Sequence, residues 1–261
     1  MRMDMDALTA LKLLAAWGAD EALENAALDR LAPEPAASRR TRAVSAPSPM
    51  PTFGAGAAGA AERARAVAAS ADGLAALRAA IASFEAISLR DTASGPVLFD
   101  GDPDSDLLVI GPPPSADDDR AGRPLVGAAG AFFDAMLASI GLTREGLLLA
   151  PLIPWRPPGD RPPSPAELAI CLPFLHRLLA LSRPRIALLL GPLTARVMLG
   201  TERRPPRGRF TEVRTPGRET PLACLPMANP AQVRADSTLR RTAWAELRLV
   251  RRQLSANITQ S

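Results

Sequence analysis

Four short runs of consecutive apolar residues constrain the fold of this chain more than any other feature. They lie at 107–111 (LLVIG), 147–153 (LLLAPLI), 185–191 (RIALLLG) and 222–227 (LACLPM), and helical patterns separate them. Strands of a parallel sheet have such runs, because helices cover both faces of the sheet and no side chain points to water. The pattern predicts an α/β fold, a three-layer α/β/α sandwich with a central four-stranded parallel sheet.

The segments around these runs have the spacing of amphipathic helices. We expect helices over about 61–84, 128–140, 164–178, 192–199 and 236–254. The third begins with the sequence SPAE from Ser164, a capping box with proline at the first helical position. Cys171 lies on the apolar stripe of that helix, so we expect a core residue there and not a ligand.

The N-terminal part differs from the rest. Residues 1–31 have leucines at helical spacing, which predicts a small N-terminal helical element. Residues 32–60 are rich in Pro, Ala, Ser and Gly, which is typical of a disordered linker. We therefore expect one folded domain over 61–261, preceded by a tether that could recruit a protein partner through residues 1–60.

The charge pattern allows a nucleic-acid partner. The net charge is +4, and 30 of the 31 basic residues are arginine, which stays charged and binds phosphate in bidentate fashion. Residues 100–119 carry seven Asp and no basic residue, whereas 183–218 carry nine Arg and two Glu. This asymmetry indicates one side that faces a polyanion, although a solvated surface of mixed charge would look the same.

Cysteine content and the N-terminus bear on the compartment. Cys171 and Cys224 are the only cysteines, they are far apart, and no CxxC is present. A disulfide framework or a complete metal site is therefore not expected. Charged residues interrupt the N-terminus, and no apolar stretch approaches the length of a membrane span. We expect a cytoplasmic monomer that makes no contact with a membrane.

Several motifs in sequence order resemble those of one enzyme family. Residues 109–127 (VIGPPPSADDDRAGRPLVG) are similar to the first motif of type-4 uracil-DNA glycosylases, usually GEAPG followed by an acidic run and GRPFVG. Residues 152–175 resemble the family's RPPGNR stretch and its following helix, and LPMANPAQVR (225–234) resembles its closing motif, commonly PTYHPAYLLR. Residues 17–32 resemble the extension of its alphaproteobacterial branch. The resemblance implies the glycosylase fold from about residue 84 to 254.

The same resemblance implies a pocket in which a flipped base loses its N-glycosidic bond. Its pocket-equivalent positions are Gly111, Pro112, Leu125, Pro151 and Asn229. Four of them depart from the family: Pro112 stands for its Glu, Leu125 for its stacking Phe, Pro151 for its base-reading Asn and Asn229 for its His. Proline supplies neither an amide nor a backbone N–H, and leucine lacks a π face, whereas asparagine still donates one neutral hydrogen bond.

The family's iron–sulfur cluster is not expected here. The positions that the resemblance gives to its ligands hold Ile87 and Trp155, which leaves Cys171 alone. A cluster needs four ligands, so one thiolate cannot hold it. We therefore expect no cofactor and no metal.

Other polar residues remain as site candidates. Four arginines on the expected loops could bind DNA phosphates, or could be ordinary surface residues or partners in ion pairs: Arg123, Arg156, Arg161 and Arg234. Asp119 or Asp160 could activate water together with Asn229, but a solvated acidic loop in which a neighbouring Arg holds Asp119 or Asp160 is the more common situation. We expect His176 on the surface of its helix, away from the strand ends. Trp155 could stack on a base or pack internally.

Three functional hypotheses follow. The first is a DNA-binding homologue whose glycosylase activity is lost or strongly impaired, because four pocket groups are replaced. The second is an active glycosylase with a rebuilt pocket that acts on uracil or another damaged base. The third is a non-catalytic scaffold that works through its N-terminal tail.

Overall fold

A computed structural model describes residues 55–201 and 206–258, with side chains described up to residue 256. The predicted N-terminal helical element lies outside these ranges, as does most of the predicted linker. The linker prediction extends too far, because a helix begins at Ala55. Its alanines form a buried stripe (Ala60, Ala61, Ala64 and Ala68), which explains why a stretch without large apolar residues still folds.

The four predicted parallel strands are present and form the centre of the sheet. They are β2 (Leu107–Gly111), β3 (Leu148–Pro151), β4 (Ile186–Leu190) and β6 (Leu222–Met227). All their residues are buried except Ala223, as expected of strands covered on both faces. Along the sheet these four strands lie in the order β3-β2-β4-β6, and all four run parallel.

The predicted central four-stranded parallel sheet is confirmed, and the structure adds an unpredicted strand at each edge. Two short strands, β1 (Asp100–Gly101) and β5 (Thr211–Val213), pair antiparallel with β3 and β6 and make a mixed six-stranded sheet. Neither has a fully buried residue, so neither leaves an apolar run in the sequence.

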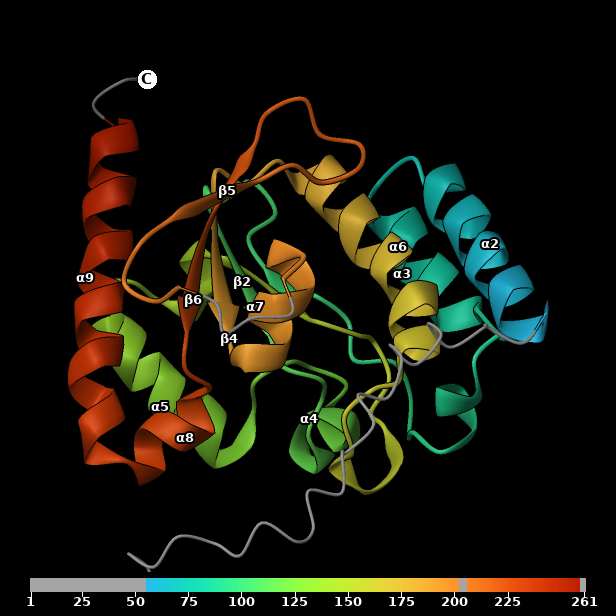
Figure 1. Ribbon diagram of the computed structural model, residues 1–261, viewed down its shortest axis with the longest axis horizontal. Helices are drawn as coiled ribbons and strands as arrows, with labels where there is room; N and C mark the ends of the chain where they lie inside the picture. The colour runs from blue at the N-terminus through green and yellow to red at the C-terminus, as the bar shows by residue number, and fades with distance from the viewer. Residues whose placement is uncertain (1–54, 202–205, 259–261) are drawn as a thin grey trace, which may run out of the picture. The chain divides into compact units, whose positions relative to one another are not determined.

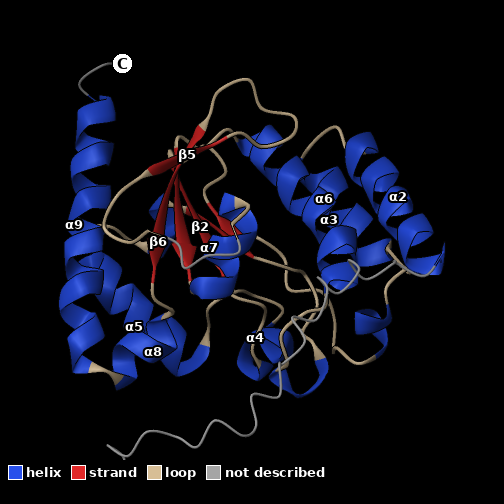
Figure 2. Ribbon diagram, in the orientation of Figure 1, coloured by secondary structure: helices blue, strands red, loops and turns tan. Residues whose placement is uncertain are grey.

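Alternate residues of each strand face two helical layers, which makes the predicted three-layer sandwich (Figures 1 and 2). One layer contains α2 (Ala55–Ser70), α3 (Leu74–Ser83), α6 (Pro165–Ser182) and α7 (Pro192–Leu199). The other contains α5 (Gly127–Ala138), α8 (Pro230–Ala235) and α9 (Ser237–Ile258). The short helix α4 (Ala116–Ala121) lies in the loop after β2.

The expected single helix over 61–84 is two helices, α2 and α3, separated at residues 71–73. Gly73 is extended and precedes the first residue of α3, which ends helical propagation there. Both helices contact α6, and the side chain of Arg177 donates to the carbonyl of Ala71 over 2.8 Å. The helices therefore belong to the folded domain.

Helix α6 corrects a further expectation. Its 18 residues are long and apolar enough to cross a membrane by length and composition alone, although the sequence was expected to contain no such stretch. Its apolar side is part of the core, where Ile170, Cys171, Phe174 and Leu178 are buried. This is the burial of a core helix.

Candidate functional site

A cavity of about 560 Å³ opens at the carboxyl edge of the parallel sheet, where ligands bind in folds of this kind. The loop after β2 forms one wall, the turn around Leu125 a second, and the loop that contains η3 (Pro158–Asp160) a third. The first turns of α7 and α8 complete it. Three pocket-equivalent positions border it, namely Pro112, Leu125 and Asn229.

The other two pocket-equivalent positions do not border this cavity. Gly111 and Pro151 end β2 and β3 side by side, as partners in the parallel register. The carbonyl of Gly111 accepts from the backbone N–H of Leu152 and from the buried hydroxyl of Thr194 on α7, each over 3.1 Å. Pro151 borders a separate small hollow on the α6 side of the sheet, beside Cys171. The strand-end proline is thus part of the framework.

The wall after β2 has few backbone donors, because Pro112, Pro113 and Pro114 follow one another and proline has no N–H. Ser115 then begins α4 with a capping box, in which its hydroxyl accepts from the N–H of Asp118. One carboxylate oxygen of Asp118 accepts from the N–H and the hydroxyl of Ser115, over 2.9 and 2.8 Å. This wall presents mostly proline rings to the cavity.

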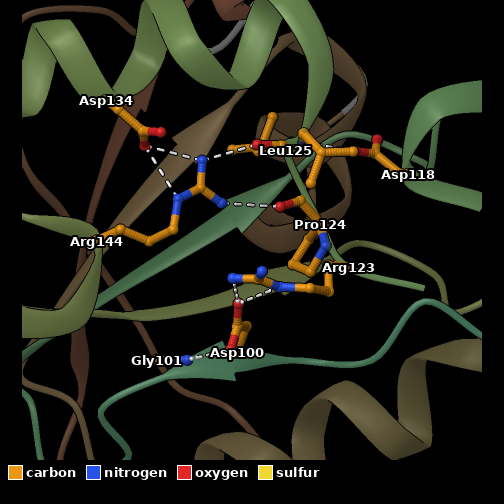
Figure 3. Close-up of polar contacts among 9 residues, drawn as sticks. Asp100, Gly101, Asp118, Arg123, Pro124, Leu125, Asp134 and Arg144 are labelled. Carbon is orange, nitrogen blue, oxygen red and sulfur yellow. Dashed lines mark hydrogen bonds and ion pairs between the residues drawn. The ribbon is translucent and has the colours of Figure 1, made fainter. Parts of the chain in front are cut away.

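Leu125 has a left-handed backbone, with φ of 51°, and its side chain is buried. Leucine pays about 1–2 kcal/mol for this conformation, so other contacts must impose it. The second carboxylate oxygen of Asp118 accepts from the N–H of Val126 over 2.8 Å, and the guanidinium of Arg144 donates to the carbonyls of Pro124 (3.0 Å) and Leu125 (2.7 Å), as Figure 3 shows. Together they fix the turn.

Asp134 on α5 positions the Arg144 side chain. Its Nε and Nη2 both donate to Asp134 on α5, over 3.0 and 2.8 Å. Its side chain is only 14% exposed, in keeping with a guanidinium that satisfies two buried carbonyls. No sequence pattern indicates this role, because the partners of Arg144 lie 10 to 20 residues away.

Three of the four arginines proposed to contact phosphate are held in ion pairs. Arg123 donates to Asp100 on β1 over 2.7 Å (Figure 3), and Arg156 donates to Asp160 over 2.7 Å. Arg161 holds both oxygens of Glu167 in a bidentate pair of 2.8 and 2.6 Å. Arg234 is exposed and makes no side-chain ion pair within the described ranges. Of the four, only Arg234 has an uncommitted charge.

The lowered pKa of Glu167 predicts a specific pH dependence of the stability of the fold. The two hydrogen bonds from Arg161 lower the pKa of this carboxyl group to about 2, against the opposing effect of burial. A lowered pKa stabilises the fold above the unfolded pKa near 4.5, and this stabilisation is lost as the pH falls towards 2. Because Arg161 is partly exposed, we expect a contribution of about 2 kcal/mol.

Urea denaturation of wild type and Glu167→Gln at a series of pH values measures this contribution. The variant is expected to be less stable by a constant amount between pH 7 and about 5, and this difference should shrink below pH 4.5 until the two proteins converge near pH 2. Glu219→Gln, which changes an exposed carboxylate, is the control and should follow wild type throughout. A gap between wild type and Glu167→Gln that persists at pH 2 would contradict the assignment.

The two aspartates considered as catalysts are both engaged. Asp119 is buried and accepts from the N–H of Ser94 over 3.0 Å and from its hydroxyl over 2.9 Å, so it anchors another loop and does not border the cavity. Asp160 borders the cavity, but its hydrogen bond from Arg156 lowers its pKa below the usual value. A carboxylate of lowered pKa is a weak general base.

Asn229 caps α8. Its side-chain oxygen accepts from the N–H of Ala231 over 3.0 Å, which assigns Nδ2 as the group left to donate. The side chain borders the cavity. Asn229 is therefore both a structural cap and the pocket-equivalent residue that retains a side-chain donor.

Two cavity residues were missed at the level of sequence. Arg196 on α7 and Gln232 on α8 both border the cavity, and both are exposed. Arg196 makes no ion pair within the parts of the chain that the structure describes. Its position one turn after Pro192, the first residue of a helix that follows a strand end, could have indicated it.

The residues at the implied iron–sulfur positions lie in the core. Ile87, Trp155 and Cys171 are buried in one cluster, and the indole of Trp155 packs against the rings of Phe84 and Phe174 at centroid distances of 6.3 and 6.5 Å. Trp155 is thus a packed indole and is not placed to stack on a base. Burial raises the pKa of the Cys171 thiol.

This donor set does not fit a cluster. In residues 55–201 and 206–258, no group of three or more His, Cys, Asp or Glu side chains is placed to hold a metal ion. His176, expected on the surface, is half-buried beside α2, and burial lowers its pKa.

Comparison with known proteins agrees with the fold. The family model of the uracil DNA glycosylase superfamily matches residues 98–248. The chain is 36% identical to the type-4 uracil-DNA glycosylase of Archaeoglobus fulgidus over 115 residues, 44% of this chain and 58% of that protein. It is 33% identical to that of Pyrobaculum aerophilum over 93 residues (36% and 47%) and 31% identical to that of Sulfurisphaera tokodaii over 121 residues (46% and 55%). The chain thus spans about half the length of the curated relatives it matches.

Proposed function

The chain belongs to the uracil DNA glycosylase superfamily, and from this premise we propose that it is a DNA-binding member whose glycosylase activity is lost or strongly impaired. The observation that carries the proposal is the state of the acidic groups at the cavity. Asp118 is occupied by Ser115 and Val126, and Asp160 is paired with Arg156. Neither is free to take a proton from an attacking water.

The remaining cavity wall supports the same proposal. Hydrolysis of an N-glycosidic bond leaves charge on the departing base, which preorganised donors must stabilise. Pro112, Pro113 and Pro114 have no N–H to offer, and Leu125 presents an aliphatic side chain where a ring would stack. Among the pocket-equivalent positions, Asn229 alone is left with a side-chain donor, and it is a neutral one. Loss of one such donor typically costs about 10²- to 10³-fold in rate, so loss of several leaves little activity.

Uracil release tests the proposal. Full-length protein is incubated with uracil-containing single- and double-stranded oligonucleotides, beside the type-4 uracil-DNA glycosylase of Archaeoglobus fulgidus as the active reference. We expect no release above the background without enzyme. Release at a rate comparable with the reference would refute the proposal.

The DNA-binding part of the proposal is supported by Arg196 and Arg234, the uncommitted cations at and beside the cavity. Each phosphate contact contributes about 0.7 to 0.9 to the slope of log K against log salt. The double variant Arg196→Gln/Arg234→Gln is therefore expected to bind DNA more weakly and to reduce the slope by between about 1 and 2. Arg123→Gln, which removes an arginine already paired with Asp100, should change the slope less. Equal slopes in wild type and the double variant would exclude phosphate contacts by this pair.

One observation favours an alternative function. The cavity of about 560 Å³ remains open and keeps the Nδ2 group of Asn229 at its border, so it could hold a damaged base other than uracil. A panel of lesion-bearing oligonucleotides tests this alternative. Excision of any lesion by wild type, lost in Asn229→Asp, would support it, and excision of none would remove it.

Variants of Asn229 distinguish its role as the N-cap of α8 from its role as a hydrogen-bond donor at the cavity. Aspartate is as good an N-cap as asparagine but cannot donate, whereas alanine can do neither. We expect Asn229→Ala to lower the free energy of unfolding by about 1 kcal/mol and Asn229→Asp to leave it almost unchanged. Thermal denaturation measures both, and an equal loss in the two variants would show that the cap is not the stabilising contact.

A further inference from the structure

The exposed side of α9 has a composition unlike that of the other helices. It carries four arginines and one tryptophan, which we call the α9 face: Arg241, Trp244, Arg248, Arg251 and Arg252. The only acidic residue of α9, Glu246, is buried on the opposite side, where Arg207 binds both of its oxygens over 2.9 and 2.8 Å. The positive charge of the α9 face is therefore not balanced on its own helix.

These five residues share one side of the helix. At 3.6 residues per turn they fall within about 100° of arc. Ala243, Leu247 and Val250 lie on the other side and are fully buried in the core. Within the described ranges, none of the four arginines forms an ion pair or a side-chain hydrogen bond, in contrast to Arg240, which donates to the carbonyls of Val233 and Arg234 and so joins α9 to α8. The four guanidinium groups are free to bind a ligand.

Trp244 lies among the arginines of the α9 face. Its side chain is 44% exposed, and it is the only large hydrophobic residue so exposed among those that the structure describes. Arg241 and Arg248 lie one turn before and one turn after it. An indole between guanidinium groups offers a base a flat ring on which to stack, and offers its phosphates the flanking charges.

We propose that the α9 face binds single-stranded DNA, with its arginines on phosphates and Trp244 stacked on an unpaired base. The proposal rests on the proposed function in taking DNA as the partner, but it concerns a surface on the outer edge of the second helical layer, distinct from the cavity at the strand ends (Figure 1). A membrane fits less well, because the apolar side of α9 is already buried and one indole is little area to insert. Duplex DNA would use the arginines and leave the indole without an accessible base face.

The face extends far enough for several nucleotides. Residues 241 to 252 span 11 steps of about 1.5 Å, or roughly 16 Å along the helix axis. Arg241 lies about 10 Å along the axis from Arg248, and Arg248 about 6 Å from Arg252, so these three arginines can contact separate phosphates of an extended strand. The positively charged track and the single aromatic platform are the two parts of a site that holds single strands without reading their sequence.

The test measures binding of a labelled oligothymidylate to the full-length chain by fluorescence anisotropy at several salt concentrations. The α9 triple variant Arg241→Gln/Arg248→Gln/Arg252→Gln is compared with a control triple of equal charge change on other surfaces, Arg63→Gln/Arg183→Gln/Arg214→Gln. We expect the α9 triple to bind at least roughly tenfold more weakly and to reduce the salt slope by about 2, and the control to stay close to wild type. Trp244→Ala should also weaken binding roughly tenfold, and Trp244→Phe should retain most of it.

Three results would overturn the proposal. If wild type binds oligothymidylate and the α9 triple binds it as tightly as the control triple does, the α9 face is not the site, although DNA binding elsewhere stands. If the α9 triple loses binding to phosphatidylserine vesicles but not to DNA, the surface binds lipid. If wild type binds no oligothymidylate at low salt, both this proposal and the DNA-binding part of the proposed function fail, whereas the uracil-release assay is unaffected.

Discussion

Arg144→Ala is expected to lower the free energy of unfolding by about 3 kcal/mol. The variant leaves the buried carbonyls of Pro124 and Leu125 without their donors and removes the partner of Asp134. A buried polar group without a partner costs about 1–3 kcal/mol, and water that enters the space of the lost side chain recovers part of it. Urea denaturation monitored by circular dichroism measures the loss.

Arg123→Ala is the matched control, two residues from the same turn (Figure 3). Arg123 is 60% exposed and pairs with Asp100, so its loss is expected to cost less than about 1 kcal/mol. Arg144→Lys keeps the charge but cannot reach both carbonyls and the carboxylate with one ammonium group, and should fall between the two. If Arg144→Ala and Arg123→Ala were equally stable, the carbonyl contacts would not hold the turn.

Gly130→Ala is expected to be almost as damaging, for a steric reason. A Cβ at this position of α5 would lie 1.9 Å from the carbonyl oxygen of Leu125, which is backbone and cannot move aside cheaply. Either the helix shifts or the Leu125 carbonyl leaves Arg144. We expect a loss of about 3 kcal/mol, at the upper end of overpacking effects.

Gly59→Ala, within α2, gives the opposite expectation. Its Cβ would meet only the end of the Arg63 side chain at 3.6 Å, an ordinary contact. Alanine is the better helix former, so this variant should gain between about 0.5 and 1 kcal/mol. Thermal denaturation of both variants tests the pair, and a stable Gly130→Ala protein would mean that the turn at Leu125 can rearrange.

Much of the fold was predictable because buried parallel strands leave continuous apolar runs. The predicted segments 107–111 and 222–227 match β2 and β6, and 192–199 matches α7. The edge strands β1 and β5 were missed, since two or three half-exposed residues have no hydrophobic period. The short helices α4 and α8 were missed for a related reason, because six residues are less than two turns.

The candidate site was predictable in position but not in its contacts. The rule that ligands bind at the carboxyl ends of parallel strands located the cavity beside Pro112 and Asn229. Which charges are free depends on the ion pairs that form: Arg156 and Arg161 pair with carboxylates four and six residues away, whereas Arg123 pairs with Asp100, 23 residues away, and residue type alone did not decide among these outcomes. Asp118 and Asp119 are neighbours in the same acidic run, yet the first holds the turn at Val126 and the second holds Ser94.

The same limit applies to the aromatic residues. Trp155 and Trp244 are indistinguishable by residue type, but one is packed between Phe84 and Phe174 and the other is exposed. The exposed arginines of α9 lie outside its apolar stripe of Ala243, Leu247 and Val250. That four of them form no ion pair with the residues that the structure describes became clear only from the structure, in which Glu246 pairs with Arg207.

The strained turn at Leu125 has a consequence for how such proteins diverge. Its shape is imposed from outside, by a carboxylate, a guanidinium and a glycine that belong to the framework, and not by the side chain at position 125. Mutation can therefore exchange that side chain while the main chain stays where it is. At this turn the backbone conformation and the chemistry of the side chain can therefore change independently, so a protein of this fold can lose or change its reaction while the fold stays stable.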